Sequence, residues 1–129
     1  MSRPGAARDR GEATTQLVVL TPLLIMLVFL GIQTAIYFHA ANVAAAAASQ
    51  GAAAGAPIGA GVDGAAEGAA RTIAELGGRP STAPFATSNG AFLVVTVEIS
   101  VPRILPFFPS TVRRTATEPV ERFVTESNR

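Results

Sequence analysis

The feature that most limits the fold of this chain is an apolar run near its start. Residues 17–32 (LVVLTPLLIMLVFLGI) contain no charged side chain, and after Gln33 and Thr34 the apolar character resumes as far as Phe38. About 22 residues in an α-helix span roughly 33 Å, which matches the ~30 Å hydrocarbon core of a bilayer. The rest of the 129-residue chain is too polar and glycine-rich to cover such a helix on all sides. The run therefore predicts one membrane-spanning helix.

The arginines around the apolar run predict its orientation. Arg3, Arg8 and Arg10 precede the run, whereas the first arginine after it is Arg71. Positive charge near the end of a membrane helix favours the cytoplasmic side. We therefore expect a single-pass protein of the cytoplasmic membrane, with a cytoplasmic N-terminus and an extracytoplasmic C-terminal region.

The membrane helix is expected to continue beyond the lipid. Residues 41–56 (ANVAAAAASQGAAAGA) have high helix propensity up to Pro57,. Their small side chains permit close approach of another helix, and Gly51 and Gly55 form a GxxxG pair. Pro22 lies inside the run, where a bend or local loosening is expected, and the Thr21 hydroxyl is suited to bond freed backbone groups.

The C-terminal part predicts a short helix followed by a β-hairpin. A helix over residues 65–76 would place Ala69, Ile73 and Leu76 on one face, and turn-forming residues fill 79–90,. Residues 91–101 alternate between apolar and polar side chains, which predicts a strand, and residues 111–118 are expected to return beside it,. Residues 105–108 form an apolar tip between the two strands.

The chain is thus expected to be an α+β protein in three parts. Residues 1–11 form a basic leader, residues 12–56 the membrane helix with its alanine-rich extension, and residues 57–129 a small extracytoplasmic region with a polar tail. A lone hairpin is marginally stable in water. The outer region is therefore expected to pack on the long helix or on neighbouring subunits.

Composition argues against catalysis, cofactors and nucleic acid. The chain has no cysteine and one histidine, and its ten basic residues nearly balance nine carboxylates,. Residues 59–64 match GxGxxG, but no strand precedes them, so a glycine-rich turn is expected. The glutamates and arginines of residues 113–126 are expected to form a solvated, ion-paired surface. The sequence predicts no catalytic residue, metal, cofactor or small-molecule substrate.

The N-terminal segment resembles a known family. A basic leader, Gly11, a polar stretch and an apolar run with Pro22 near its start resemble TadE-like proteins of the tight-adherence (Flp-type) pilus system. The resemblance implies a minor pilin or pseudopilin whose leader is removed between Gly11 and Glu12 by a prepilin peptidase. It also implies partners among Tad/Flp assembly proteins and pilins.

One position departs from the pilin pattern. After cleavage, Gln16 would be the fifth residue, where pilins ordinarily carry a glutamate that neutralises the N-terminal amine of a neighbouring subunit. Glutamine accepts a hydrogen bond from an amine but does not cancel its charge. We expect Gln16, Pro22, Gly51 and Gly55 to be subunit-packing residues.

The favoured function is therefore a non-catalytic subunit or assembly factor of a Tad pilus or related secretion system, acting through helix packing and protein contacts. One alternative is a small secreted protein released by signal peptidase at small residues between 40 and 48. Another is a single-pass anchor for a different envelope complex.

Overall fold

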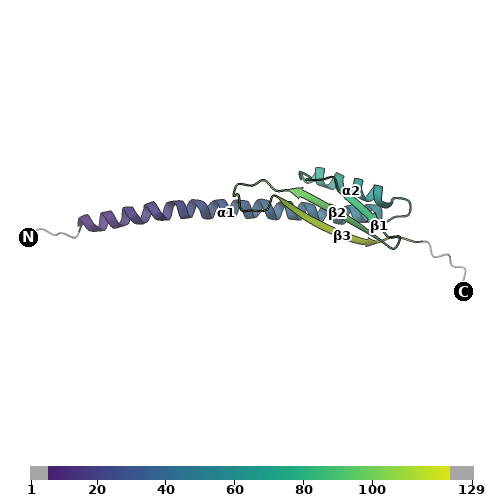
Figure 1. Cartoon of the computed structure of the whole chain (residues 1–129), viewed down its shortest axis with the longest axis horizontal. Helices are drawn as coiled ribbons and strands as arrows, with labels where there is room; N and C mark the ends of the chain where they lie inside the picture. The colour runs from purple at the N-terminus through teal and green to yellow at the C-terminus, as the bar shows by residue number, and fades with distance from the viewer. Residues whose placement is uncertain (1–5, 123–129) are drawn as a thin grey trace, which may run out of the picture.

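A computed structural model shows a long helix whose C-terminal half carries a small α+β unit (Figure 1). The structure describes the backbone of residues 6–122 and the side chains of residues 14–122. In chain order the elements are α1 (Ala6–Gly55), α2 (Gly61–Glu75), β1 (Phe85–Ser88), β2 (Phe92–Ser100) and β3 (Thr111–Pro119). The strands form one antiparallel sheet in the order β1-β2-β3. The α+β prediction, with a long apolar N-terminal helix, is confirmed.

Helix α1 is one continuous element of 50 residues, which makes it about 75 Å long,. It runs unbroken through Pro22, so the proline does not interrupt the helix. The Thr21 hydroxyl donates to the Leu17 carbonyl (2.7 Å). Pro22 leaves the carbonyl of Val18 without its helical donor, so the Thr21 bond does not compensate for the proline.

The second half of α1 packs on α2 through glycine and alanine. A Cβ atom on Gly51 would lie 2.8 Å from the Cβ of Ala69, and one on Gly68 would lie 2.6 Å from the Cβ of Ala54. Glycines at these positions let the two helix backbones approach closely, and alanine methyl groups fill the remaining space. The sequence predicted such an approach, and the partner helix is α2 of the same chain.

The sheet lies against both helices and supplies the larger core side chains. The inward side chains of β2, predicted from the alternating pattern, are all buried: Leu93, Val95, Val97 and Ile99. Val112 of β3 is buried beside them. Burying each such side chain contributes about 1.5–3 kcal/mol. The outer region thus gains the support on the long helix that its thin core was expected to need.

Three details of the outer region differ from the sequence predictions. Helix α2 begins at Gly61, so residues 61–64, expected to belong to a glycine-rich turn, form its first turn. The segment expected to be all turn contains strand β1, whose Ala86 is half-buried and whose other three residues are exposed. Leu76, expected on the buried face of the short helix, is 45% exposed. The chain leaves α2 at Leu76 and turns at Gly77, which has a positive φ of 69°, so Leu76 points away from the core,.

Candidate membrane and subunit interface

The two halves of α1 lie in different surroundings. Every residue from 14 to 32, which we call the bare half, is exposed, whereas residues 33–55, the packed half, carry the α+β unit (Figure 1). The bare half presents large apolar side chains; Leu23, for example, is 57% exposed. Leaving such a side chain in water forgoes about 1.5–3 kcal/mol. By length and composition Thr14–Gly55 is a candidate membrane span.

Gln33 marks the boundary between the two halves. It is the first buried residue of α1 after the bare half, and its side chain has 0% exposure. Its Oε1 accepts hydrogen bonds from the backbone N–H groups of Ile104 (2.7 Å) and Leu105 (3.3 Å). Its Nε2 donates to the carbonyl of Pro102 (3.1 Å). The buried amide thus accepts two hydrogen bonds and donates one, all with a single loop, and only its second N–H is not used there.

Gln33 holds the loop that connects β2 to β3. This loop comprises residues 101–110, and we call it the β2–β3 loop. Its closing bond joins the N–H of Val101 to the carbonyl of Ser110 (2.8 Å). Ile104 and Phe107 are 45% and 67% exposed. In Figure 1 this loop lies over α1 at the point where the bare half ends. Sequence reasoning found the apolar tip of the loop but not its attachment to Gln33, because the partners lie about 70 residues apart in the chain.

The sequence-predicted packing residues Gln16 and Pro22 lie in the bare half. Both are exposed. Gln16 lies on the same side of α1 as Val19, Leu20 and Leu23, with which it lines a shallow surface hollow. The predicted cleavage residues, Gly11 and Glu12, belong to the backbone of α1. Both precede residue 14, where the described side chains begin.

Gly51 and Gly55, the other predicted packing residues, are buried within the chain. A Cβ on Gly55 would lie 2.5 Å from the Cβ of Ala65 and 2.5 Å from Cδ2 of Leu93. The contact made by these glycines is therefore internal, between α1, α2 and β2. Contacts between subunits at these two positions stay a prediction.

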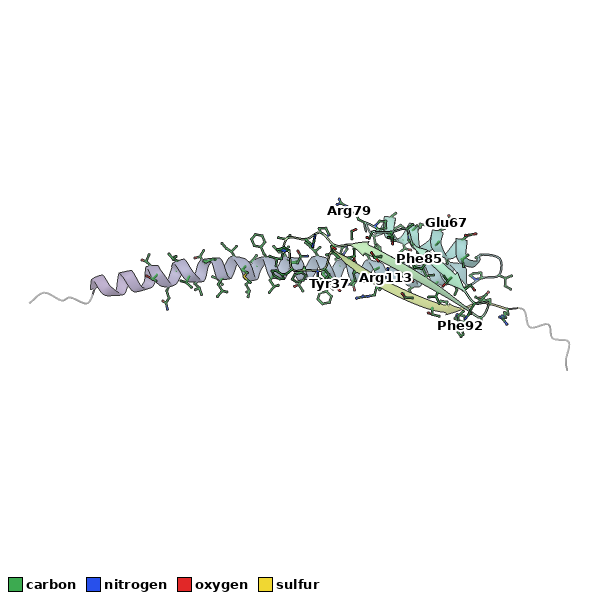
Figure 2. All side chains as sticks on the ribbon, in the orientation of Figure 1. Tyr37, Glu67, Arg79, Phe85, Phe92 and Arg113 are labelled. Atoms are coloured by element: carbon green, nitrogen blue, oxygen red, sulfur yellow. The ribbon has the colours of Figure 1, made fainter. Side chains whose placement is uncertain are left out.

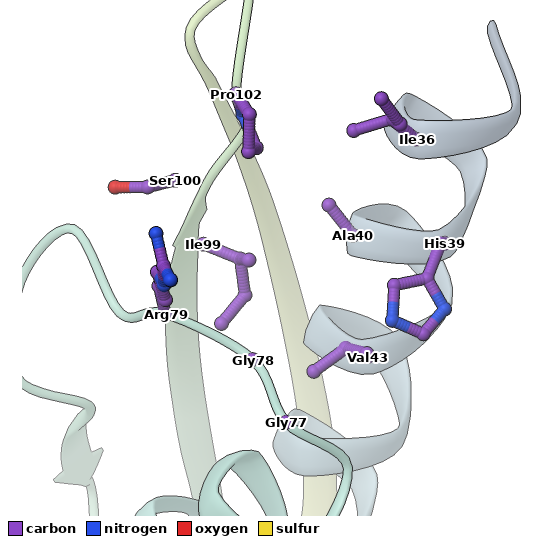
Figure 3. Close-up of a pocket in the computed structure, with 10 residues that line it drawn as sticks. All are labelled: Ile36, His39, Ala40, Val43, Gly77, Gly78, Arg79, Ile99, Ser100 and Pro102. Atoms are coloured by element: carbon purple, nitrogen blue, oxygen red, sulfur yellow. The ribbon is translucent and has the colours of Figure 1, made fainter. Parts of the chain in front are cut away.

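A hollow of about 300 Å³ lies beside the boundary, between α1, β2 and the segment that follows α2 (Figure 3). Its lining is mainly apolar, and its ionisable side chains are those of His39 and Arg79. The Ser100 hydroxyl also lines the hollow, but no carboxylate does, so the residues that line it do not assemble a serine–histidine–carboxylate centre,.

Ionisable groups are dispersed over the described side chains. Among residues 14–122, no cluster of three or more histidine, aspartate or glutamate residues is arranged to hold a metal ion. In that same part of the chain the ion pairs are Arg71 with Glu67 and Arg113 with Glu98. The ion pairing expected among residues 113–126 is therefore wrong for the described part of that segment: Arg113 pairs with Glu98 of β2, and Arg122 donates to the carbonyl of Gly90. Glu126 lies outside the described residues.

A comparison with protein families gives a match that begins at the glycine of the predicted cleavage site. Residues 11–53 match the family model described as TadE-like protein. The chain carries a TadE-like segment. This match confirms the resemblance over these residues, which make up a third of the chain. The TadE-like family is a family of pilus components and is not known for enzymatic activity. Comparison with curated proteins found no match, and comparison with solved structures found none either.

The TadE-like segment coincides with one structural element. It covers the bare half of α1 and nearly all of the packed half, and it ends two residues before α1 ends at Gly55. The α2 helix and the sheet lie beyond it. The family pattern therefore includes the span and the helix surface on which the outer unit is built.

Proposed function

We propose that this chain is a non-catalytic TadE-like subunit or assembly factor of a Tad pilus or a related secretion system. The observation that carries the proposal is the family match over residues 11–53, together with an apolar bare half that no part of the described chain covers. A helix of this kind acts by packing in the membrane against lipid and against other helices. Its α+β unit is then available for protein contacts outside the membrane.

In the proposed orientation, residues before the bare half lie in the cytoplasm and the α+β unit lies on the other side of the cytoplasmic membrane. Three arginines precede the bare half, and the next arginine in the chain, Arg71, lies on α2. This asymmetry supports a cytoplasmic N-terminus because arginines near a span are retained on that side.

Subunit contacts are proposed for the face of the bare half that contains Gln16. In the folded chain Gly51 and Gly55 are occupied by α2, so a second helix would reach them only after α2 had moved away. The hollow lined by Gln16, Val19 and Leu23 is open and lies within the lipid-facing stretch. Its lining is mainly apolar, which suits contact with a neighbouring helix, and Pro22 directly precedes Leu23 in the sequence.

We further propose that prepilin peptidase removes the leader between Gly11 and Glu12. Processing would remove Arg3, Arg8 and Arg10, and a span without these charges is easier to extract toward the outside because no arginine then has to enter the bilayer,. Removal of the leader would also make Gln16 the fifth residue of the mature chain.

The structure disfavours release by signal peptidase between residues 40 and 48. Six residues in this stretch are buried in the core shared with α2 and the sheet: Ala40, Ala41, Val43, Ala44, Ala47 and Ala48. Cleavage there would cut the helix on which the outer unit folds. A plain anchor for another envelope complex stays as the second candidate, because it requires the same span.

The N-terminus of the protein recovered from membranes tests the processing step. We expect Glu12 as the first residue in cells that contain prepilin peptidase and an intact leader in cells that lack it. A start between residues 41 and 49 would support secretion, and an intact leader in both strains would contradict the processing proposal.

Photo-crosslinking tests the pilus role. A photoreactive amino acid at Val19, on the Gln16 face, is expected to capture pilins or Tad assembly proteins, which mass spectrometry identifies. The matched control is the same amino acid at Ile25, which lies roughly opposite Gln16 on the helix because nine residues advance about 900°. Equal crosslinking at both positions, or capture of other envelope proteins alone, would contradict the proposed contact.

A further inference from the structure

We propose that the β2–β3 loop is a second point of attachment to the membrane. Its residues 104–108, which comprise Ile104 and the apolar tip, insert into the headgroup region of the leaflet at which α1 leaves the bilayer. The partner is the phospholipid surface itself. The inference rests on α1 crossing the membrane, as in the proposed function, but not on any role in a pilus.

The position of the loop is fixed by Gln33. Both polar atoms of this fully buried amide bond the loop, through Ile104 and Leu105 on one side and Pro102 on the other. Because Gln33 directly follows the bare half, the loop is held at the end of the lipid-facing stretch and not farther along the packed half.

The length of the bare half places this attachment at the membrane surface. From Thr14 to Gln33 the helix rises about 29 Å, which nearly equals the ~30 Å hydrocarbon thickness of a bilayer. With Thr14 at the inner boundary of the hydrocarbon, Gln33 lies at the outer boundary. The loop beside it then lies among headgroups, and its tip borders the acyl chains.

The side chains of the loop suit that depth. Ile104 and Phe107 are large, apolar and exposed, and the ring of Phe107 lies against that of Phe108 with centroids 5.7 Å apart. Arg103 is exposed next to them and carries a charge that phosphate groups attract,. The sequence from Ser100 to Thr117 contains no carboxylate that anionic or zwitterionic headgroups would repel.

The backbone of the loop also carries few free donors. Three of its residues are prolines and have no N–H group: Pro102, Pro106 and Pro109,. Ile104 and Leu105 donate to Gln33, and Phe108 donates to the carbonyl of Leu105 (3.3 Å). Unpaired N–H groups are costly near hydrocarbon, so this arrangement lowers the cost of bringing an irregular loop against lipid.

A second attachment would fix the orientation of the α+β unit relative to the membrane. A single helix lets the unit rotate about the helix axis, whereas a helix and a loop together fix which side of the α+β unit faces the membrane. The sheet is then presented to partners in one orientation.

Tryptophan fluorescence tests the inference in the full chain, which contains no tryptophan of its own. Three single variants are prepared in phosphatidylcholine vesicles: Phe107→Trp in the loop, Phe29→Trp in the bare half, and Phe92→Trp at the far end of the sheet (Figure 2). All three phenylalanines are exposed. Lipids brominated near the top of the acyl chain quench only a tryptophan that contacts them.

We expect Phe107→Trp to be strongly quenched and to emit at shorter wavelength than Phe92→Trp, which stays unquenched. Quenching of Phe29→Trp without quenching of Phe107→Trp would overturn the inference and leave the span intact. Absence of quenching for Phe29→Trp would instead contradict the span. A blue shift of Phe107→Trp without quenching, seen only at low lipid-to-protein ratio, would assign the loop to a second copy of the chain and overturn lipid contact.

The role of Gln33 is tested by a second substitution in the Phe107→Trp chain. Gln33→Leu removes all three bonds to the loop and is expected to weaken quenching of Trp at position 107. Gln50→Leu, an exposed glutamine on the same helix, is the matched control and is expected to leave quenching unchanged. Circular dichroism verifies that both variants keep their secondary structure. Equal quenching in both folded variants would overturn the assigned role of Gln33.

Discussion

The two halves of α1 belong to one helix but are built for different neighbours. The bare half has large side chains such as Leu23 and Phe29, all exposed, whereas the packed half is mostly alanine and glycine and is buried along one side. Lipid adapts to any side-chain shape, so large apolar residues are favoured there. A neighbouring helix is rigid, so close packing requires small residues. Side-chain size along the helix therefore indicates which neighbour each half contacts.

The largest expected effect comes from removing core volume next to the packed half. Leu93→Ala takes a fully buried side chain from β2 and should lower the free energy of unfolding of the outer unit by about 2–5 kcal/mol,. Leu23→Ala removes the same atoms from the bare half and should leave that free energy unchanged. Hydrogen exchange of the β2 amides measures both. Similar losses for the two variants would mean that the bare half also packs on protein within the chain.

A methyl group added to a glycine should have opposite effects in the two halves. Gly55→Ala forces a Cβ to within 2.5 Å of Ala65 and Leu93, which should destabilise the outer unit by about 2 kcal/mol,. Gly31→Ala meets no atom within 4 Å and should stabilise the helix by up to about 1 kcal/mol,. Thermal unfolding in detergent, followed by circular dichroism, compares the two. A destabilising Gly31→Ala would show that the bare half has a close protein neighbour.

The smallest effect is expected at the boundary between the halves. Gln33→Leu leaves the carbonyl of Pro102 and the N–H groups of Ile104 and Leu105 without their partner, at a cost of about 1 kcal/mol because the loop is able to reach water,. Exchange of the Ile104 and Leu105 amides should accelerate while the β2 amides stay protected. Gln50→Leu serves as the control. Unchanged exchange at Ile104 would contradict the hydrogen bonds from Gln33.

The parts of the fold that were predictable from sequence have local, periodic signals. The apolar run, the alternation over residues 91–101 and the return strand after Pro109 each depend on neighbours in the chain. The long apolar helix and the two strands are confirmed. Strand β1 was missed because proline, serine and asparagine surround four residues of which one is half-buried. Antiparallel pairing with β2 makes this segment a strand, and its own sequence does not indicate that pairing.

The site was less predictable because its key contacts are distant in sequence. Gln33 interrupts an apolar run and gives no sign of the loop that it bonds. Gly51 and Gly55 indicate close helix approach, but the pattern does not distinguish another subunit from α2. The family resemblance identified the segment through residues 10–38, where the pattern is linear in sequence.

A single-cysteine scan along α1 tests most directly the claim that the helix passes from lipid into protein at Gln33. The chain contains no cysteine, so each introduced thiol is unique. In vesicles, cysteines at Leu23 and Leu27 should resist a membrane-impermeant maleimide, cysteines at the exposed residues Ala45 and Ala53 should react from the outside, and a cysteine at the buried Ala47 should react only after unfolding. Rapid labelling at Leu23 and Leu27, comparable to that at Ala53, would contradict the account.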